Sequence, residues 1–112
     1  MVRNYIPEQG DIIYIDFDPT VEHEQKGPRP ALVISNKQFN EHIKMSLVCP
    51  ITNNNKPHPF HIYFLTKKIK GSIMCEQLRT VDFVIRKAKF KEKIPDDILQ
   101  EVVEIISSFM KI

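Results

Sequence analysis

The period of the apolar residues changes once along the chain, at Pro95, and this change constrains the fold more than any other feature. Before Pro95, polar residues and most of the eight prolines separate short apolar segments. These segments predict a half-buried strand at residues 11–17 and further strands at 31–34, 45–49, 60–64, 73–75 and 85–90. After Pro95, apolar residues recur every three or four positions, as in an amphipathic helix. We therefore expect several short strands closed by one C-terminal helix, a small α+β barrel.

Length and cysteine content limit the classes of protein that are possible. With 112 residues, the chain provides one domain, residues 1–112, and contains no repeat or linker. No apolar run approaches the roughly 18–20 residues of a membrane-spanning helix, and the N-terminus lacks the apolar region of a secretory signal. Cys49 and Cys75 are too few for a disulfide framework, and both lie in apolar strand patterns. We expect a cytoplasmic protein with reduced, buried thiols and no membrane contact.

Basic residues are concentrated in the middle of the chain. The net charge is only +2, but residues 56–93 contain ten Lys or Arg against three Asp or Glu. Residues 94–112 contain one against four. The basic segment suits either a polyanionic partner or solvated outer faces of strands. The charge pattern alone therefore admits a nucleic acid partner without requiring one.

Arg29 and Thr52 lie where predicted strands meet polar segments. Pro28 and Pro30 flank Arg29 and restrict the backbone around it. A guanidinium held in this way suits forked binding of a phosphate, and the alternative is a salt bridge to a neighbouring carboxylate. The Thr52 hydroxyl can donate to a phosphoryl oxygen or form a local hydrogen bond with the turn that follows. Neither residue identifies a function by itself.

The segment at residues 75–82 and the histidines each leave several roles open. Residues 75–82 follow a strand in a rhythm compatible with one turn of helix, and Glu76 can face a ligand or pair with Arg79. No His-x3-His spacing and no Cys/His cluster occurs, so the sequence predicts no metal site and no cofactor. His58 and His61 lie in the basic segment, where isolated histidines are usually structural or solvated.

Five motifs, together with the terminal helix, carry a resemblance that covers essentially the whole chain. In order, they are Gly10-Asp11, Asp16-Phe17-Asp18-Pro19, Glu24-Gln25-x-Gly27-x-Arg29-Pro30, Pro50-Ile51-Thr52 and Glu76-Gln77-x-Arg79-Thr80-x-Asp82. The chain thereby resembles the MazF family (MazF, PemK and Kid toxins). These proteins are ribosome-independent, sequence-specific endoribonucleases of bacterial type II toxin–antitoxin modules.

The resemblance implies a fold and a catalytic pair. The fold is an SH3-like barrel of short, mostly antiparallel strands that forms a homodimer with a groove for single-stranded RNA. The family's catalytic arginine and its Thr or Ser fall on Arg29 and Thr52. An acidic position that some members use for RNA contact or catalysis falls on Glu76, and Glu24 varies in role between members. Met74 stands where PemK and Kid members place a second catalytic arginine, so that role is not carried over.

The implied reaction needs no metal, because RNA supplies its own nucleophile, the 2′-hydroxyl. We expect Arg29 to stabilise the charged transition state and Thr52 to bind a non-bridging oxygen, whereas the general base remains open. Glu24 and the neighbouring His23 are candidates for that base. Contacts to the RNA bases are expected from Phe17, Gln25, Asn36, Lys56, Gln77 and Arg86. Phe17 can equally pack in the core with Ile13 and Ile15.

The same resemblance predicts the partners. They are single-stranded RNA or mRNA, a second copy of the chain and a MazE-like antitoxin, whose acidic segment would compete with RNA for the basic groove. DNA is contacted only indirectly, through the antitoxin complex. Two alternatives stay open, a CcdB-like gyrase poison and a catalytically silent RNA- or peptide-binding barrel. The gyrase poisons rely on a C-terminal tryptophan, and this chain has no tryptophan.

Overall fold

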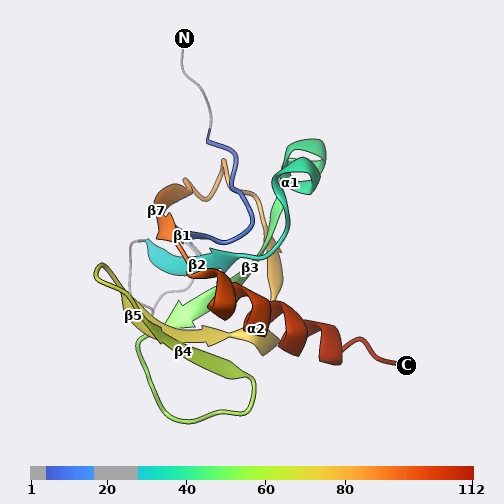
Figure 1. Ribbon diagram of the computed structural model, residues 1–112. Helices are drawn as coiled ribbons and strands as arrows, with labels where there is room; N and C mark the ends of the chain where they lie inside the picture. The colour runs from blue at the N-terminus through green and yellow to red at the C-terminus, as the bar shows by residue number, and fades with distance from the viewer. Residues whose placement is uncertain (1–4, 17–27) are drawn as a thin grey trace, which may run out of the picture.

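The computed structural model describes residues 5–16 and 28–112, which form a curled antiparallel sheet with two α-helices (Figure 1). The strand order is β4-β5-β3-β2-β1-β7, and β6 pairs with β3 beside this path. The strands are β1 (Asp11–Ile15), β2 (Arg29–Val33), β3 (Ser46–Thr52), β4 (His61–Leu65), β5 (Lys70–Met74), β6 (Arg79–Val81) and β7 (Lys89–Lys93). The predicted α+β class, with short antiparallel strands and a C-terminal helix, is confirmed.

The central strands are buried on both faces of the sheet. One face carries a core cluster that includes Ile12, Leu32, Cys49, Ile51 and Ile73. The other carries Ile13, Ile15, Ala31, Val33, Val48 and Val81. The alternation at residues 11–17 predicted a strand with one buried face. In the structure β1 is buried on both faces, because the C-terminal helix packs over Ile12 while Tyr5 and Ala88 pack on the other side.

The C-terminal helix α2 (Asp96–Ser108) covers one face of the sheet (Figure 1). Val102 and Ile106 are buried there, and burial of such a side chain contributes about 1.5–3 kcal/mol. Pro95 is the N-cap and provides no side-chain cap hydrogen bond, and Asp96 and Asp97 occupy the first turn. Phe109 and Met110 continue the apolar spacing in the sequence, but both residues lie beyond the helix and are 41% and 66% exposed. No helix in the described part of the chain has the length and apolar character to span a bilayer.

A short helix, α1 (Lys37–Ile43), was not predicted from the sequence. Asn36 caps its N-terminus by accepting a hydrogen bond from the Phe39 backbone N–H at 2.9 Å. Lys44 ends it in the left-handed conformation, with φ of 63°. Its buried residue is Asn40, whose side-chain amide donates to the Pro7 carbonyl at 2.8 Å. Because this contact is polar, the segment shows none of the apolar periodicity that predicted α2.

The strand predicted at residues 85–90 is wrong in position. Residues 83–87 form a turn, and strand β7 begins at Lys89. The Asp82 carboxylate accepts hydrogen bonds from the backbone N–H groups of Val84 and Ile85, both at 3.0 Å, which stabilises the turn. Lys87 has φ of 57°, which is incompatible with a continuous strand. Strand β6, directly before this turn, was also not predicted.

Gly71 allows β5 to approach the end of β3. A Cβ atom at this position would lie 2.7 Å from Cγ2 of Ile51 and 2.8 Å from the carbonyl oxygen of Thr52.

We predict that Gly71→Ala lowers the free energy of unfolding by about 1–3 kcal/mol, as overpacking does. Urea denaturation measures the change. Leu65→Ala, at a 68% exposed position of the adjacent strand, should change stability by less than about 0.5 kcal/mol. Equal stability of Gly71→Ala and the parent chain would contradict this packing.

Candidate functional site

Strand register brings Arg29 and Thr52 to the same face of the sheet. Strands β2 and β3 are antiparallel, with Ala31 opposite Pro50. Arg29 begins β2 and Thr52 ends β3, so continuing this register by two residues places them opposite each other. Directly opposed residues of an antiparallel pair have Cβ atoms about 4.5–5.5 Å apart. By this continuation, two side chains that are 23 positions apart in sequence would be neighbours at one edge of the core.

The row continues across the neighbouring strands. Ile15 of β1 is opposite Arg29, Thr52 is opposite Ser72 of β5, and Ser72 is opposite Tyr63 of β4. We call these five residues the Arg29–Thr52 row. Ile15 and Ser72 are buried, Arg29 and Thr52 are half-buried, and Tyr63 is exposed. Ser72 and Tyr63 were not predicted as site residues, because their hydroxyls meet Thr52 only through pairing of β4 and β5 with β3.

The expected alternative for Arg29, a salt bridge, is not found within residues 5–16 and 28–112. Ion pairs in this part of the chain join Lys37 and Lys93 to Glu8, and Lys93 to Asp11, while His61 lies 2.9 Å from Glu76. None involves Arg29. A half-buried guanidinium with five donors at the end of a strand suits a phosphate oxygen.

The expected alternative for Thr52 is present. Its Oγ1 accepts a hydrogen bond from the Asn54 backbone N–H at 3.2 Å, which shapes the turn after β3. In this bond Oγ1 acts as an acceptor, so the hydroxyl proton is not used. The local bond therefore fixes the position of Oγ1 and is compatible with donation from the hydroxyl to a ligand.

Glu76 lies in a short 3-10 helix (Cys75–Gln77) and pairs with His61 at the start of β4. Nε2 of His61 and Oε2 of Glu76 are 2.9 Å apart. Burial opposes ionisation of Glu76, but hydrogen bonds from His61, the backbone and Gln77 outweigh it and hold the pKa of the carboxyl below its usual range. His61 is opposite Met74, two residues along β5 from Ser72, so it shares a face with the Arg29–Thr52 row.

The structure also brings His58 to this pair, although the sequence predicted no metal site. The imidazole rings of His58 and His61 stack with centroids 3.9 Å apart and an interplanar angle of 15°. One possible ligand atom from each of His58, His61 and Glu76 lies within 4.8 Å of the other two. The spacing His58-x-x-His61 around Pro59 was the only local signal, since Glu76 joins the histidines through the pairing of β4 with β5.

The remaining predicted RNA contacts are distributed over the molecule. Gln77 is next to Glu76, and Lys56 is exposed in the loop after β3. The Arg86 guanidinium donates to the Asp16 carbonyl at 3.1 Å, directly after β1. Asn36 caps α1 at the opposite end of β2 from Arg29. Phe17, Glu24 and Gln25 lie outside the described residues, as does His23.

The family of the chain follows from comparison with known proteins. A family model described as "PemK-like, MazF-like toxin of type II toxin-antitoxin system" matches residues 8–110. The chain belongs to this toxin family. The chain is 35% identical to the endoribonuclease toxin MazF of Escherichia coli K12 over 100 residues, covering 89% of this chain and 90% of that protein. It is 32% identical to the endoribonuclease PemK of Escherichia coli, covering 92% of this chain and 81% of PemK.

A solved structure of the family has the same fold as this MazF-like toxin. The crystal structure of MazE–MazF (Form-II) from Deinococcus radiodurans matches with a TM-score of 0.87 and 30% identity. The match covers 96% of this chain and 97% of the other. The fold expected from the resemblance is therefore confirmed.

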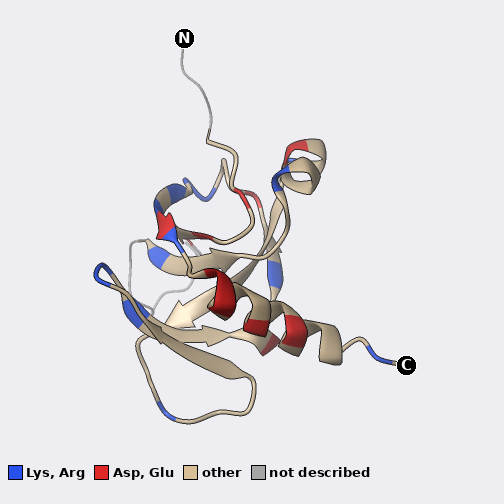
Figure 2. Cartoon of the chain, viewed as in Figure 1, with Lys and Arg blue, Asp and Glu red and all other residues tan. Residues whose placement is uncertain are grey.

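Charge is distributed unevenly over this MazF-like toxin. Basic residues mark the turn between β4 and β5 and the region of β7, whereas acidic residues line α2 (Figure 2). Lys70 begins β5, is exposed, and is two residues from Ser72 on the same face as the Arg29–Thr52 row. A polyanion approaching this face would be attracted, whereas α2 on the other face would repel it.

The two thiols near the site are unsuited to nucleophilic chemistry. Burial, with a smaller contribution from the Glu76 charge, raises the pKa of Cys75 to about 11, and burial also raises the pKa of Cys49.

We predict that both thiols react slowly with Ellman's reagent at pH 8 in the native protein and rapidly in urea. Because the unfolded thiols ionise at lower pH, the free energy of unfolding should fall as the pH rises above about 9. Fast native reaction of either thiol would contradict the burial described here.

Proposed function

We propose that this MazF-like toxin is a sequence-specific endoribonuclease that cleaves single-stranded RNA without a ribosome or a metal ion. Its relatives MazF and PemK of Escherichia coli are named endoribonucleases. The observation that carries the proposal for this chain is the register of β2 and β3, which sets Arg29 opposite Thr52 on a polar part of one face. We further propose that residues 1–112 act as one domain and that the protein works in the cytoplasm.

The proposed reaction uses the RNA's own 2′-hydroxyl. This oxygen attacks the adjacent phosphorus, the P–O5′ bond breaks, and the products are a 2′,3′-cyclic phosphate and a 5′-hydroxyl. The attacking hydroxyl loses a proton to a general base, and the leaving oxygen gains one. Arg29 is unsuited to be the base, because a guanidinium stays protonated in proteins. Its forked donors instead stabilise the negative charge of the transition state and can supply the proton to O5′.

Thr52 complements Arg29 in this proposal. Its hydroxyl donates to a non-bridging phosphate oxygen while the bond from Asn54 holds Oγ1 in place. Glu76 would contact RNA or act as the base, because the bond to His61 keeps its carboxylate ionised at neutral pH. Glu24 is the other acidic candidate for these roles. Selection of the RNA sequence would come from base contacts by Phe17, Gln25, Asn36, Lys56, Gln77 and Arg86.

We predict that Arg29→Ala lowers the rate of RNA cleavage by about 10²–10³-fold, because one preorganised charged donor is lost. Arg29→Lys should recover only part of this loss, since an ammonium lacks the forked geometry. Sequencing the 5′ ends of fragments from a long RNA, treated in EDTA without ribosomes, measures both activity and specificity. This assay also separates an endoribonuclease from a gyrase poison or a silent binding barrel.

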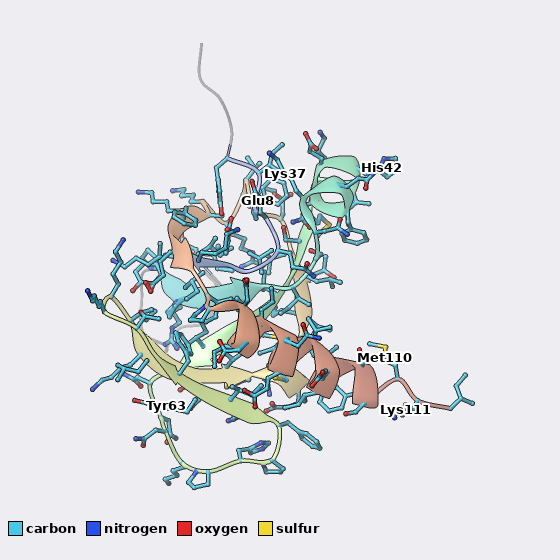
Figure 3. The ribbon with its side chains drawn as sticks, in the orientation of Figure 1. Glu8, Lys37, His42, Tyr63, Met110 and Lys111 are labelled. Carbon is cyan, nitrogen blue, oxygen red and sulfur yellow. The ribbon has the colours of Figure 1, made fainter. Side chains whose placement is uncertain are left out.

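The matched control for the lost charge is Lys37→Ala. Lys37 belongs to α1, beyond the opposite end of β2 from Arg29, and its exposed side chain is 3.7 Å from Glu8 (Figure 3). This variant should cleave RNA at the parent rate, because an exposed ion pair contributes little to stability. Near-normal cleavage by a folded Arg29→Ala variant would refute the role of Arg29.

The face that carries the Arg29–Thr52 row and the exposed Lys70 suggests the partners of the proposed enzyme. We propose that the protein forms a homodimer, as expected for its family, and that RNA and a MazE-like antitoxin bind the same basic surface. The Deinococcus radiodurans relative was crystallised as MazE–MazF. An acidic antitoxin segment would match the charge of Lys70 and its neighbours, and it would exclude RNA by occupying their surface. DNA would be reached only through the antitoxin.

We predict that RNA binding depends strongly on salt. With an oligonucleotide that carries 2′-deoxyribose at the scissile position, raising salt from 50 to 200 mM should weaken binding about tenfold or more. Lys70→Gln should reduce the slope of log Kd against log salt by about 0.7, the value for one phosphate contact to a single strand. Lys111→Gln, in the segment after α2, should leave the slope unchanged. Fluorescence anisotropy gives these values, and equal slopes for all three proteins would exclude Lys70 from the RNA surface.

A further inference from the structure

We propose that His58, His61 and Glu76 form a binding site for a divalent transition-metal ion, with Zn²⁺ as the best match. Two imidazoles and one carboxylate are a ligand set that zinc accepts, with the fourth position open to water. The proposal concerns ion binding by these three residues and does not depend on RNA cleavage.

The backbone holds the two histidines on the same side. The His61 N–H donates to the His58 carbonyl at 3.1 Å and closes a turn through Pro59 and Phe60. Proline favours such a turn because its φ is already fixed. This turn brings the two imidazoles together, and their rings stack with centroids 3.9 Å apart. Stacked rings aim their in-plane lone pairs in parallel directions, so the exposed His58 ring would turn out of the stack when both histidines bind one ion.

A second backbone contact holds Glu76 next to this turn. The Cys75 backbone N–H donates to the Phe60 carbonyl at 3.1 Å and ties the 3-10 helix to the histidine turn. The carboxylate therefore stands beside His61, with Oε2 2.9 Å from Nε2. His61 and Glu76, from two chain segments, are thus close together before any ion arrives.

The distances between the ligand atoms suit a small ion after a modest adjustment of the side chains. With bonds of about 2.0–2.1 Å, two ligands of a tetrahedral zinc ion are about 3.3 Å apart. His61 and Glu76 are a few tenths of an ångström closer than this, because a proton now lies between them. The ion would replace that proton. His58 completes the set, since one ring nitrogen lies within 4.8 Å of the other two ligand atoms and its exposed side chain can adjust.

The site is open to solvent yet partly sheltered. The His61 and Glu76 side chains are 14% and 30% exposed, and His58 is exposed. An ion can therefore enter from water, and His61 is the one residue of the three that is half-buried.

Calorimetry with Zn²⁺ and absorption spectroscopy with Co²⁺ test the site, using untagged protein that has been treated with chelator. We expect one ion per chain, and visible Co²⁺ bands typical of four or five ligands. Mg²⁺ should not compete, because it prefers oxygen ligands and octahedral geometry. No binding of Zn²⁺, or displacement of Co²⁺ by Mg²⁺, would overturn the proposal.

The variants His58→Gln, His61→Gln and Glu76→Gln should each weaken Zn²⁺ binding by at least about tenfold. His42→Gln is the matched control, because His42 lies on α1, away from β4 (Figure 3). His58 is exposed, so its variant should retain the parent melting temperature and separates loss of a ligand from loss of the fold. Binding that survives His58→Gln or is lost in His42→Gln would refute the site. Because the readout is ion binding, failure here leaves the proposed RNA cleavage intact.

Discussion

The antiparallel register of β3 with its neighbours is the constraint on which the rest of the structure depends. It sets Thr52 beside Ser72 on one side and, by continuation, beside Arg29 on the other. A shift of one residue would move Thr52 to the opposite face, into the apolar cluster under α2. The close approach at Gly71 and the buried side chains on both faces oppose such a shift. The same register therefore determines both the packing of the core and the positions of the polar side chains in this sheet.

Much of the fold was predictable where apolar periodicity was strong. Local apolar spacing alone predicts the strands around residues 11–17 and 31–34 and the helix after Pro95. Prediction failed where polar contacts determine the structure. Helix α1 packs through Asn40, and the turn after Asp82 is held by hydrogen bonds from its carboxylate, so neither segment has an apolar period.

The candidate site was only partly predictable for a related reason. Arg29, Thr52 and Glu76 stand at strand ends within recognisable motifs, and this made them candidates. Ser72 and Tyr63 have no such motif and join the row only when β4, β5 and β3 are paired. The association of Glu76 with His61 likewise spans 15 positions. Side chains brought together by long-range pairing leave no signal in a single sequence.

The end of the chain is joined to the histidine turn by an aromatic contact. The rings of Phe60 and Phe109 meet edge to face, with centroids 5.0 Å apart and an interplanar angle of 90°. Phe60 lies between His58 and His61, so the residues that follow α2 help to hold the loop that carries both imidazoles. Fusion partners and purification tags are for this reason better attached before the first strand than after Ile112, where they would crowd this aromatic pair.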